Sequence, residues 1–286
     1  MHNATRSTTV LAQKPHTRNA VDNTDWLKTL AIILVAVDHI GYFFIDDNEW
    51  WSVFGRLAAP SFFFLIGYAG TRTVPFHWIW LGVILTVLDS WNNHWSWVTP
   101  NILFSLALIR LARPHVRTLL QSRGWIALAL IACAILALLP IADNILDYGA
   151  EGFLWGLFGL CQRMYIEAGS AVDRHGAAQG AVGFAQAATR NAGRMRLLTC
   201  ALAAIVYAWQ EQAEYSFARI HLATFILGIG VLSIGLCRFR RAASPIQPPE
   251  ALTGILRFIG RHTLEIYALQ LAGSELLIKL VPKLAP

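Results

Sequence analysis

The sequence predicts an all-α protein, a polytopic bundle of about nine transmembrane helices. Hydrophobic residues make up 56% of the 286-residue chain and charged residues only 14%, with a mean hydropathy of +0.48. A water-soluble domain usually carries about 25% charged residues. The apolar residues fall in blocks of about 17–22, separated by short polar stretches, as in polytopic membrane proteins. The basic residues gather in alternate connecting segments.

The predicted helices follow from these blocks in order. The first has Thr24 and Asp25 at its start, which suit a helix cap and the positive end of the helix dipole. Pro60 and Pro100 lie near the starts of the second and fourth helices, where neighbouring helices can satisfy the freed carbonyl groups. The nine predicted helices are 26–45, 52–70, 76–92, 97–112, 124–141, 149–166, 197–213, 217–236 and 257–279.

The distribution of charge predicts the topology. Eighteen of the 23 Lys and Arg residues fall in the N-terminal segment and in every second connecting segment after it. The intervening segments hold three basic residues and collect acidic ones, including Asp46, Asp47 and Glu214. This alternation predicts an odd number of spans, with the N-terminus inside and the C-terminus outside. It also accounts for the net charge of +6 without a nucleic-acid partner.

The remaining segments predict a single domain. Residues 1–24 are polar and contain no apolar signal-peptide region, which indicates a flexible cytoplasmic tail. Residues 25–286 then form one transmembrane domain, because no loop is long enough for another. The longest loop, about 167–196, is rich in Gly, Ala and Arg and is expected on the inner surface or mobile. The cysteines are spaced one per apolar segment, which indicates small buried hydrophobes with neither a disulfide framework nor a metal site; they are Cys133, Cys161, Cys200 and Cys237.

Ionisable residues inside the first two helices are the first candidates for function. Asp38, His39 and Arg56 lie within apolar runs, where a charged group costs several kcal/mol unless it is paired or hydrated. Lys28 and His39 share one helix face to within about 20° and lie about 16 Å apart along the axis. That distance is roughly the length of a pantetheine arm. The phosphates of a cytosolic acyl-CoA could rest on Lys28 while the thioester reaches His39. Alternatively, Lys28 extends to lipid headgroups and His39 bonds a neighbouring helix.

A polar layer in the outer third of the membrane supports the first interpretation, because polar residues from many helices at one depth are typical of a hydrated cavity. The layer comprises Asp38, His39, Arg56, Asp89, Asn101, Glu151, Gln210, His221 and Gln270. Asp38 and His39 are about 100° apart on their helix. The carboxylate that orients the imidazole is therefore expected from another helix, with Asp89 and Glu151 as candidates and Asp38 kept as an alternative. Arg56 could stabilise a thioester oxyanion or neutralise Asp38.

Basic residues at the inner face are candidates for the nucleotide end of the donor. Arg72, Arg110 and Arg113 cluster there and suit recognition of diphosphate and 3′-phosphate groups. Their alternative interpretation is that they are ordinary positive-inside residues.

The residues also resemble a known superfamily. The pattern D-W-L-K-x10-H, with Lys28 and His39, is similar to the first helix of acyltransferase-3-type membrane enzymes. LKTLAIILVAVDHIGYFF followed by GRLAAPSFFFLIGYAGTR resembles the TraX family of pilin N-acetyltransferases more closely, and Asp147-Tyr148-Gly149 resembles a later TraX element. GRHTLEIYALQL, residues 260–271, is similar to the last helix of the superfamily that includes the heparan-α-glucosaminide N-acetyltransferases.

This resemblance implies an acetyltransferase of the bacterial inner membrane. Acetyl-CoA would bind from the cytosol, and His39 would act as general base or transient acyl carrier. The acceptor would be an amine or hydroxyl on the outer side, carried by a glycan, a small molecule or a pilin-like protein. Two alternatives stay open, namely a proton-coupled permease and a non-catalytic protein of pilus assembly. The sequence leaves open whether the protein is a homodimer.

Overall fold

The computed structural model describes residues 20–45, 48–71, 73–92, 94–95, 98–142, 145–175, 182–246 and 248–281. Within these residues the only β structure is an isolated bridge between Asp22 and Ala243. The all-α prediction is therefore confirmed for the described residues. The helices are α1 (Asn23–Phe44), α2 (Glu49–Gly55), α3 (Ala58–Tyr68), α4 (Phe76–Asn92), α5 (Ile102–Ala142), α6 (Gly149–His175), α7 (Val182–Tyr215), α8 (Arg219–Arg238), α9 (Glu250–Arg261) and α10 (Thr263–Leu280).

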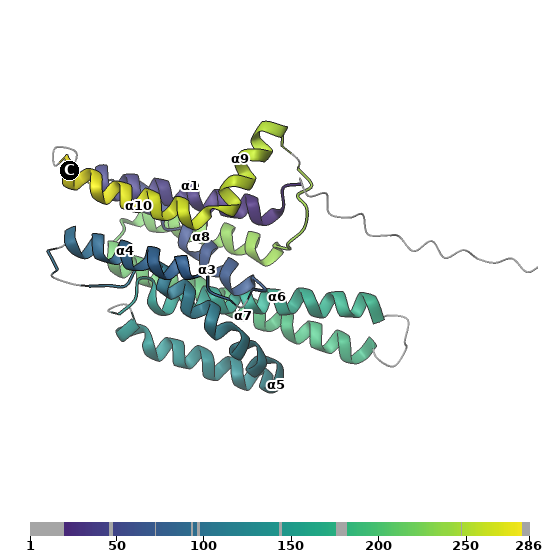
Figure 1. The fold of residues 1–286 in the computed structure, drawn as a ribbon. Helices are drawn as coiled ribbons and strands as arrows, with labels where there is room; N and C mark the ends of the chain where they lie inside the picture. Colours follow the sequence, from purple (N-terminus) through teal and green to yellow (C-terminus); the bar gives the residue numbers. More distant parts are fainter. Residues whose placement is uncertain are drawn as a thin grey trace, which may run out of the picture.

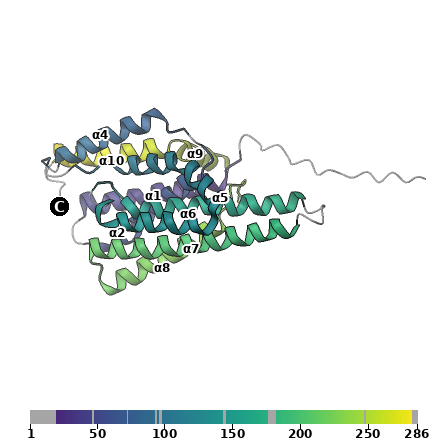
Figure 2. The ribbon, with the colours of Figure 1, turned by 90° about the horizontal axis from the view of Figure 1, so that it is seen from below.

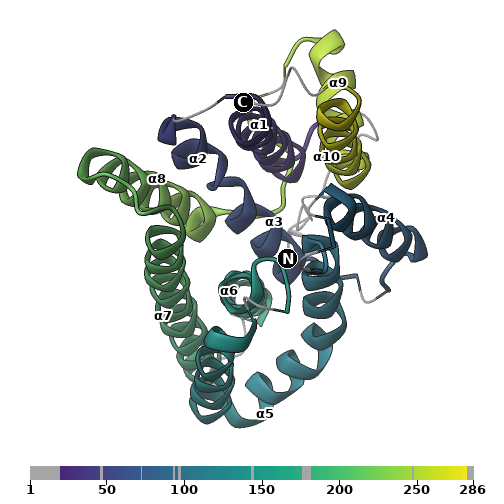
Figure 3. The same cartoon turned by 90° about the vertical axis from the view of Figure 1, so that its left-hand side faces the viewer.

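Helix α3 forms the centre of the bundle. Most helices run roughly along one direction (Figures 1 and 2), and a view along that direction shows α3 surrounded by the others (Figure 3). All residues of α3 except Ile66 are buried. Phe63 and Phe64 belong to the main hydrophobic core, together with Trp155 and Phe158 of α6. A short helix with apolar residues on every side is expected at a core position.

The contact between α3 and α6 is unusually close because glycines form it. A Cβ atom on Gly159 would overlap the carbonyl oxygen of Phe64, and one on Gly67 would overlap the carbonyl oxygen of Gly156. The backbones of the two helices therefore touch directly along this seam. The seam fixes α6, and with it the loop before α6, relative to α3.

Several of the predicted helices differ from those in the structure. The predicted helix 52–70 is divided into α2 and α3 by a turn at Arg56 and Leu57. The predicted helix 257–279 is divided at His262 into α9 and α10. Helix α9 also begins earlier than predicted, at Glu250. Helices 97–112 and 124–141 correspond to the two limbs of α5, which reverses direction at Gly124. Gly124 has φ 54°, a backbone conformation that glycine adopts without the steric cost of a side chain.

Among the described residues, three helices are long and apolar enough to cross a membrane, namely α1, α5 and α8. Other predicted spans are too short or too highly charged to count as membrane-crossing helices. The break at Arg56 and Leu57 leaves α3 with 11 residues, and α10 carries Glu265, Glu275 and Lys279. The described residues thus support a helical membrane protein. The count of nine spans and the inside position of the N-terminus stay predictions.

The segment around the start of α1 also differs from expectation. Asp22, rather than Thr24, caps α1 by accepting a hydrogen bond from the backbone N–H of Asp25 at 2.9 Å. Val21 is fully buried, whereas the prediction placed it in a flexible tail; residues 1–19 lie outside the described residues. The predicted loop 167–196 is helical up to His175 and again from Val182.

The cysteines are free thiols, and three of them are buried or half-buried as expected. Cys133 is exposed on the outer surface of α5, so the expectation of burial was wrong for this residue. Its helix limb packs on the bundle with one face only, which leaves the opposite face uncovered.

The glycine seam gives a first testable prediction. Gly159→Ala should lower the thermal unfolding midpoint in detergent, because the added methyl group forces α3 and α6 apart at a cost of about 1–3 kcal/mol. Gly169→Ala in the same helix is the matched control, since nothing lies within 4 Å of a Cβ at that position. An unchanged midpoint for Gly159→Ala would show that the seam is not tight.

Candidate functional site

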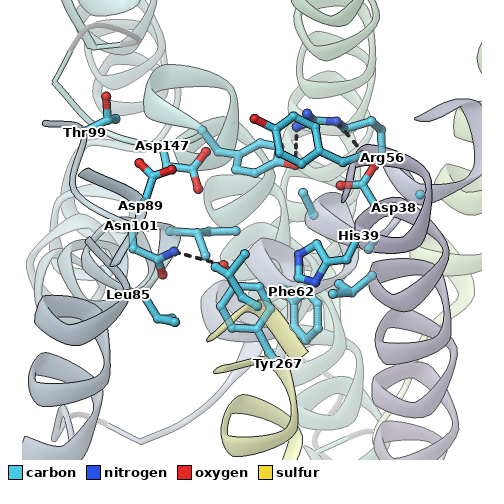
Figure 4. Close-up of a pocket in the computed structure, with 18 of the residues that line it drawn as sticks. Asp38, His39, Arg56, Phe62, Leu85, Asp89, Thr99, Asn101, Asp147 and Tyr267 are labelled. Atoms are coloured by element: carbon cyan, nitrogen blue, oxygen red, sulfur yellow. Dashed lines mark hydrogen bonds and ion pairs between the residues drawn. The ribbon is translucent and has the colours of Figure 1, made fainter. Parts of the chain in front are cut away.

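A cavity of about 370 Å³ lies among α1, α3, α4, α5, α10 and the end of α7. Its polar lining comes from several helices and from the loop before α6. These residues are Asp38, His39, Tyr42, Arg56, Thr86, Asp89, Thr99, Asn101, Asp147, Tyr148, Glu214, Tyr215, Tyr267 and Glu275. Figure 4 shows the His39 ring directed into the cavity, with Asp89 and Asn101 on the opposite wall. The structure therefore brings together Asp38, His39, Arg56 and Asp89, the four residues predicted to carry chemistry.

His39 is held by aromatic contacts rather than by a carboxylate. Its ring centroid lies 5.8 Å from that of Tyr267 and 6.1 Å from that of Phe43. Its Nδ1 atom is buried and has no hydrogen-bond partner in the described part of the chain. Neither Asp38 nor Asp89 orients this nitrogen here. The ring nitrogens of a neutral imidazole can donate or accept a hydrogen bond, so a His39 ring that lines the cavity can interact with a molecule bound there.

Arg56 is surrounded by three carboxylates. Its guanidinium lies 3.6 Å from Asp38 of α1, 3.8 Å from Glu211 and 3.8 Å from Glu214 of α7. Asp38 thus partners Arg56, one of the two roles that the sequence left open for it. The approach of α1 to α2 depends on Gly55, where a Cβ would overlap the Asp38 side chain.

Two tyrosines complete the environment of Arg56. Its guanidinium donates to the Tyr148 hydroxyl at 2.7 Å and lies over the Tyr215 ring at 4.6 Å. The Tyr207 hydroxyl of α7 donates to the backbone carbonyl oxygen of Arg56 at 2.6 Å. That bond satisfies a carbonyl oxygen at the break between α2 and α3. Arg56 is therefore fixed both in its backbone and in its side chain.

The loop before α6 is held in a strained backbone conformation. Tyr148 has φ 52°, which costs a bulky residue on the order of 1–3 kcal/mol. In this conformation the Tyr148 side chain places its hydroxyl beside the Arg56 guanidinium. The backbone carbonyl of the preceding Asp147 accepts a hydrogen bond from Ser105 at 2.7 Å. Enclosure of the Asp147 carboxyl raises its pKa to about 6, although the positive charge of Arg56 opposes the shift.

The opposite wall is formed by α4, the start of α5 and α10. The Asn101 amide donates to the Tyr267 hydroxyl at 3.1 Å, and the backbone N–H of Asn101 donates to the Thr86 hydroxyl at 3.0 Å. The Asn92 amide contacts the buried Glu275 carboxylate. Asp89 lines the cavity beside Asn101 and Asp147 (Figure 4). Carboxylates therefore outnumber the cationic groups that line this cavity.

The residues predicted to bind the donor phosphates lie outside the cavity lining. The Lys28 amine donates to the Gly260 carbonyl at 2.7 Å. Arg110 donates to the Thr71 hydroxyl at 2.6 Å and lies over the Trp78 ring at 4.7 Å. Arg113 is only 6% exposed and donates to the Gly67 carbonyl at 2.8 Å, an arrangement that ties α5 to the end of α3. Arg72 lies outside the described residues.

The predicted polar layer is only partly present in the cavity. Glu151, Gln210, His221 and Gln270 do not line it, and His221 instead pairs with Glu49 at 2.7 Å. Sequence reasoning missed Tyr267, Glu214 and Glu275. The signal available for Tyr267 was its place in the motif GRHTLEIYALQL, whereas Glu275 lies near the C-terminal end of α10 without any motif. Asp147 and Tyr148 were noted as a motif, but not as cavity residues.

In the described part of the chain, three helices that are long and apolar enough to cross a membrane indicate a helical membrane protein, with a polar cavity between its helices. Comparison with known families identifies the family to which the chain belongs. Residues 23–230, most of the chain, match the family described as "TraX protein", and the chain belongs to the TraX family.

Individual relatives are distant. The chain is 27% identical to Protein TraX of Escherichia coli over 216 residues, which are 73% of this chain and 74% of that protein. It is 30% identical to an uncharacterized protein of Rickettsia prowazekii over 132 residues, 46% of this chain. That match spans about half of the Rickettsia protein, 52% of its length. No solved structure matches this chain.

The charge cluster gives a second prediction, which concerns stability. Arg56→Gln should cost about 3–5 kcal/mol, because it leaves buried carboxylates without a counter-ion. Asp38→Asn introduced together with Arg56→Gln should restore part of this loss, because it removes one of those charges. The measurement is the thermal midpoint in detergent, with Arg219→Gln on the exposed start of α8 as control. Additive effects of the two substitutions would contradict a direct interaction.

Proposed function

We propose that this TraX-family protein is a membrane acyltransferase that uses acetyl-CoA and has His39 at its reactive centre. The protein would lie in a bacterial inner membrane, take the donor from the cytosol and deliver the acetyl group to an amine or hydroxyl on the other side. The observation that carries the proposal is the position of His39, whose ring lines the cavity and whose buried Nδ1 atom has no hydrogen-bond partner in the described part of the chain. A general base in this setting contributes typically 10²–10⁴-fold to a rate.

The reaction would proceed by direct transfer or through an acylated histidine. In direct transfer, His39 takes the proton of the acceptor N–H or O–H as that atom attacks the thioester carbonyl. The C–N or C–O bond forms, the C–S bond breaks, and the CoA thiolate takes up a proton. In the other route His39 attacks the thioester itself and passes the acetyl group to the acceptor in a second step.

The shape of the cavity favours entry of the donor from the Lys28 end of the bundle. On α10 the cavity lining extends from Glu275 to Leu264, a distance of about 16 Å at 1.5 Å per residue. Gly260, the partner of Lys28, precedes Leu264 by four residues. On α5, Arg110 lies one helical turn beyond the lining residue Leu106 and on the same face. A cation on each side thus flanks this end of the cavity.

The charges at the other end favour a cationic acceptor. Asp38, Asp89, Asp147, Glu214 and Glu275 all line the cavity, whereas the same lining holds a single guanidinium. Above pH about 6 the Asp147 carboxyl adds to this negative charge, because its pKa lies near that value. An ammonium group is attracted to such a site, and it must lose a proton before it can attack the thioester. An amine is therefore preferred over a hydroxyl.

The central experiment is turnover of acetyl-CoA by the purified, reconstituted protein. His39→Ala should reduce acetyl transfer or acetyl-CoA hydrolysis at least about 100-fold, with donor binding retained. His115→Ala, on the exposed surface of α5, is the matched control and should have wild-type turnover. Donor uptake without turnover would favour the permease. Absence of turnover in the wild type, with His39→Ala fully functional in cells, would favour the non-catalytic assembly role.

A second measurement tests the entry of the donor. Lys28→Gln and Arg110→Gln should each raise the KM for acetyl-CoA about tenfold, because a charge-assisted phosphate bond contributes about 1.5–3 kcal/mol. The KM for S-acetyl-N-acetylcysteamine, which has no nucleotide, should not change. Arg123→Gln, at an exposed position between the limbs of α5, serves as control. Equal effects on both thioesters would show that these residues act through the fold alone.

A further inference from the structure

Helix α9 has two chemically distinct sides. Its sequence is EALTGILRFIGR, and at 100° per residue the apolar and polar side chains separate completely. The apolar side is formed by Leu252, Ile255, Phe258 and Ile259, and the polar side by Glu250, Thr253, Arg257 and Arg261. Such a pattern requires an apolar environment along one side of the helix.

The fold covers only an edge of the apolar side. Leu256 and Gly260 are buried, and a Cβ on Gly260 would overlap the Asp25 carboxylate of α1. Ile255 and Phe258 are 55% and 58% exposed, and Leu252 is 40% exposed. Adjacent exposed side chains of this size usually mark a surface that contacts a membrane or another protein.

The position of α9 in the bundle indicates that its exposed side contacts the membrane rather than another protein. The Lys28 amine donates to the Gly260 carbonyl at 2.7 Å, so the end of α9 lies beside the second turn of α1. Helix α1 is a candidate span that begins at Asn23, and its first turns therefore lie where the chain enters the bilayer. Figure 1 shows α9 crossing the direction of α1 and α10 steeply and leaning away from the bundle.

A break in the chain permits this orientation. His262, with φ −107° and ψ 28°, separates α9 from α10 and ends the helical path between them. As a result α10 runs along α1, whereas α9 runs across it. A helix that runs across a span at the level of the membrane surface meets the boundary between headgroups and acyl chains along its whole length.

We propose that α9 is an interfacial membrane helix, whose Leu252, Ile255 and Phe258 insert among the phospholipid acyl chains next to the first turn of α1. Its polar side, with Arg257 and Arg261, faces the headgroups and water. The partner is the bilayer itself rather than a protein. Because α9 carries the carbonyl group that Lys28 bonds, contact with the membrane also fixes the position of the Lys28 amine. The proposal does not depend on the acyl-transfer activity.

The test uses single cysteines that carry a nitroxide spin label, in full-length protein whose four native cysteines have been replaced. Ile255→Cys and Phe258→Cys report the apolar side, and Thr253→Cys and Gly254→Cys are matched controls on the polar side. Each variant is placed in phospholipid nanodiscs with one protein copy per disc. Collision rates with oxygen, which concentrates in the acyl region, are compared with those of a water-soluble nickel chelate.

The ratio of oxygen to nickel collisions should be at least about threefold higher at positions 255 and 258 than at 253 and 254. Equal access of the nickel chelate to all four positions would overturn the proposal. Labels at 255 and 258 that are immobile and shielded from both reagents would also overturn it, since they would indicate a protein partner or a second copy. Each variant must elute and unfold as the parent protein does; Leu252→Cys replaces an apolar-side variant that fails this requirement.

Discussion

The burial of the Arg56 guanidinium is the constraint on which the rest of the site depends. It joins Asp38 of α1, Glu211 and Glu214 of α7 and the Tyr148 hydroxyl of the loop before α6. A cation in such surroundings is tolerated only when nearby groups of opposite charge offset the loss of hydration. The matching groups come from segments far apart in the chain. This cluster therefore fixes α1, α3, α6 and α7 relative to one another. In that arrangement the His39 ring faces the cavity.

The division of roles between the neighbours Asp38 and His39 follows from helix geometry. Successive side chains diverge by about 100°, so one of the two can pair with Arg56 while the other faces aromatic rings. The carboxylate is thereby occupied, and the imidazole nitrogen is left without a partner. Because this ring also lines the cavity, His39 is the residue at which we place the reactive centre.

Sequence reasoning predicted the helical class, and it also identified Asp38, His39, Arg56 and Asp89, which line one cavity. These residues could be found because polar side chains in apolar segments are conspicuous. The break between α2 and α3 could not be predicted, because it depends on tertiary hydrogen bonds such as that from Tyr207 to Arg56. Tyr267 and Glu275 were missed for a related reason, since α10 acquires its orientation only from the turn at His262. The amphipathic pattern of residues 250–261 was visible in the sequence, but the first part of it was read as loop and the rest as part of the last span.

The seam between α3 and α6 has a consequence for how molecules could exchange with the cavity. Where two backbones touch without intervening side chains, neither helix can rotate or slide without steric overlap, so this side of the bundle behaves as a fixed block. The facing wall is joined differently, through side-chain contacts such as Asn101 with Tyr267 and Asn92 with Glu275. Water can replace bonds of that kind one at a time. We therefore expect molecules to exchange with the cavity where α4 and α10 can separate, while the seam between α3 and α6 stays closed.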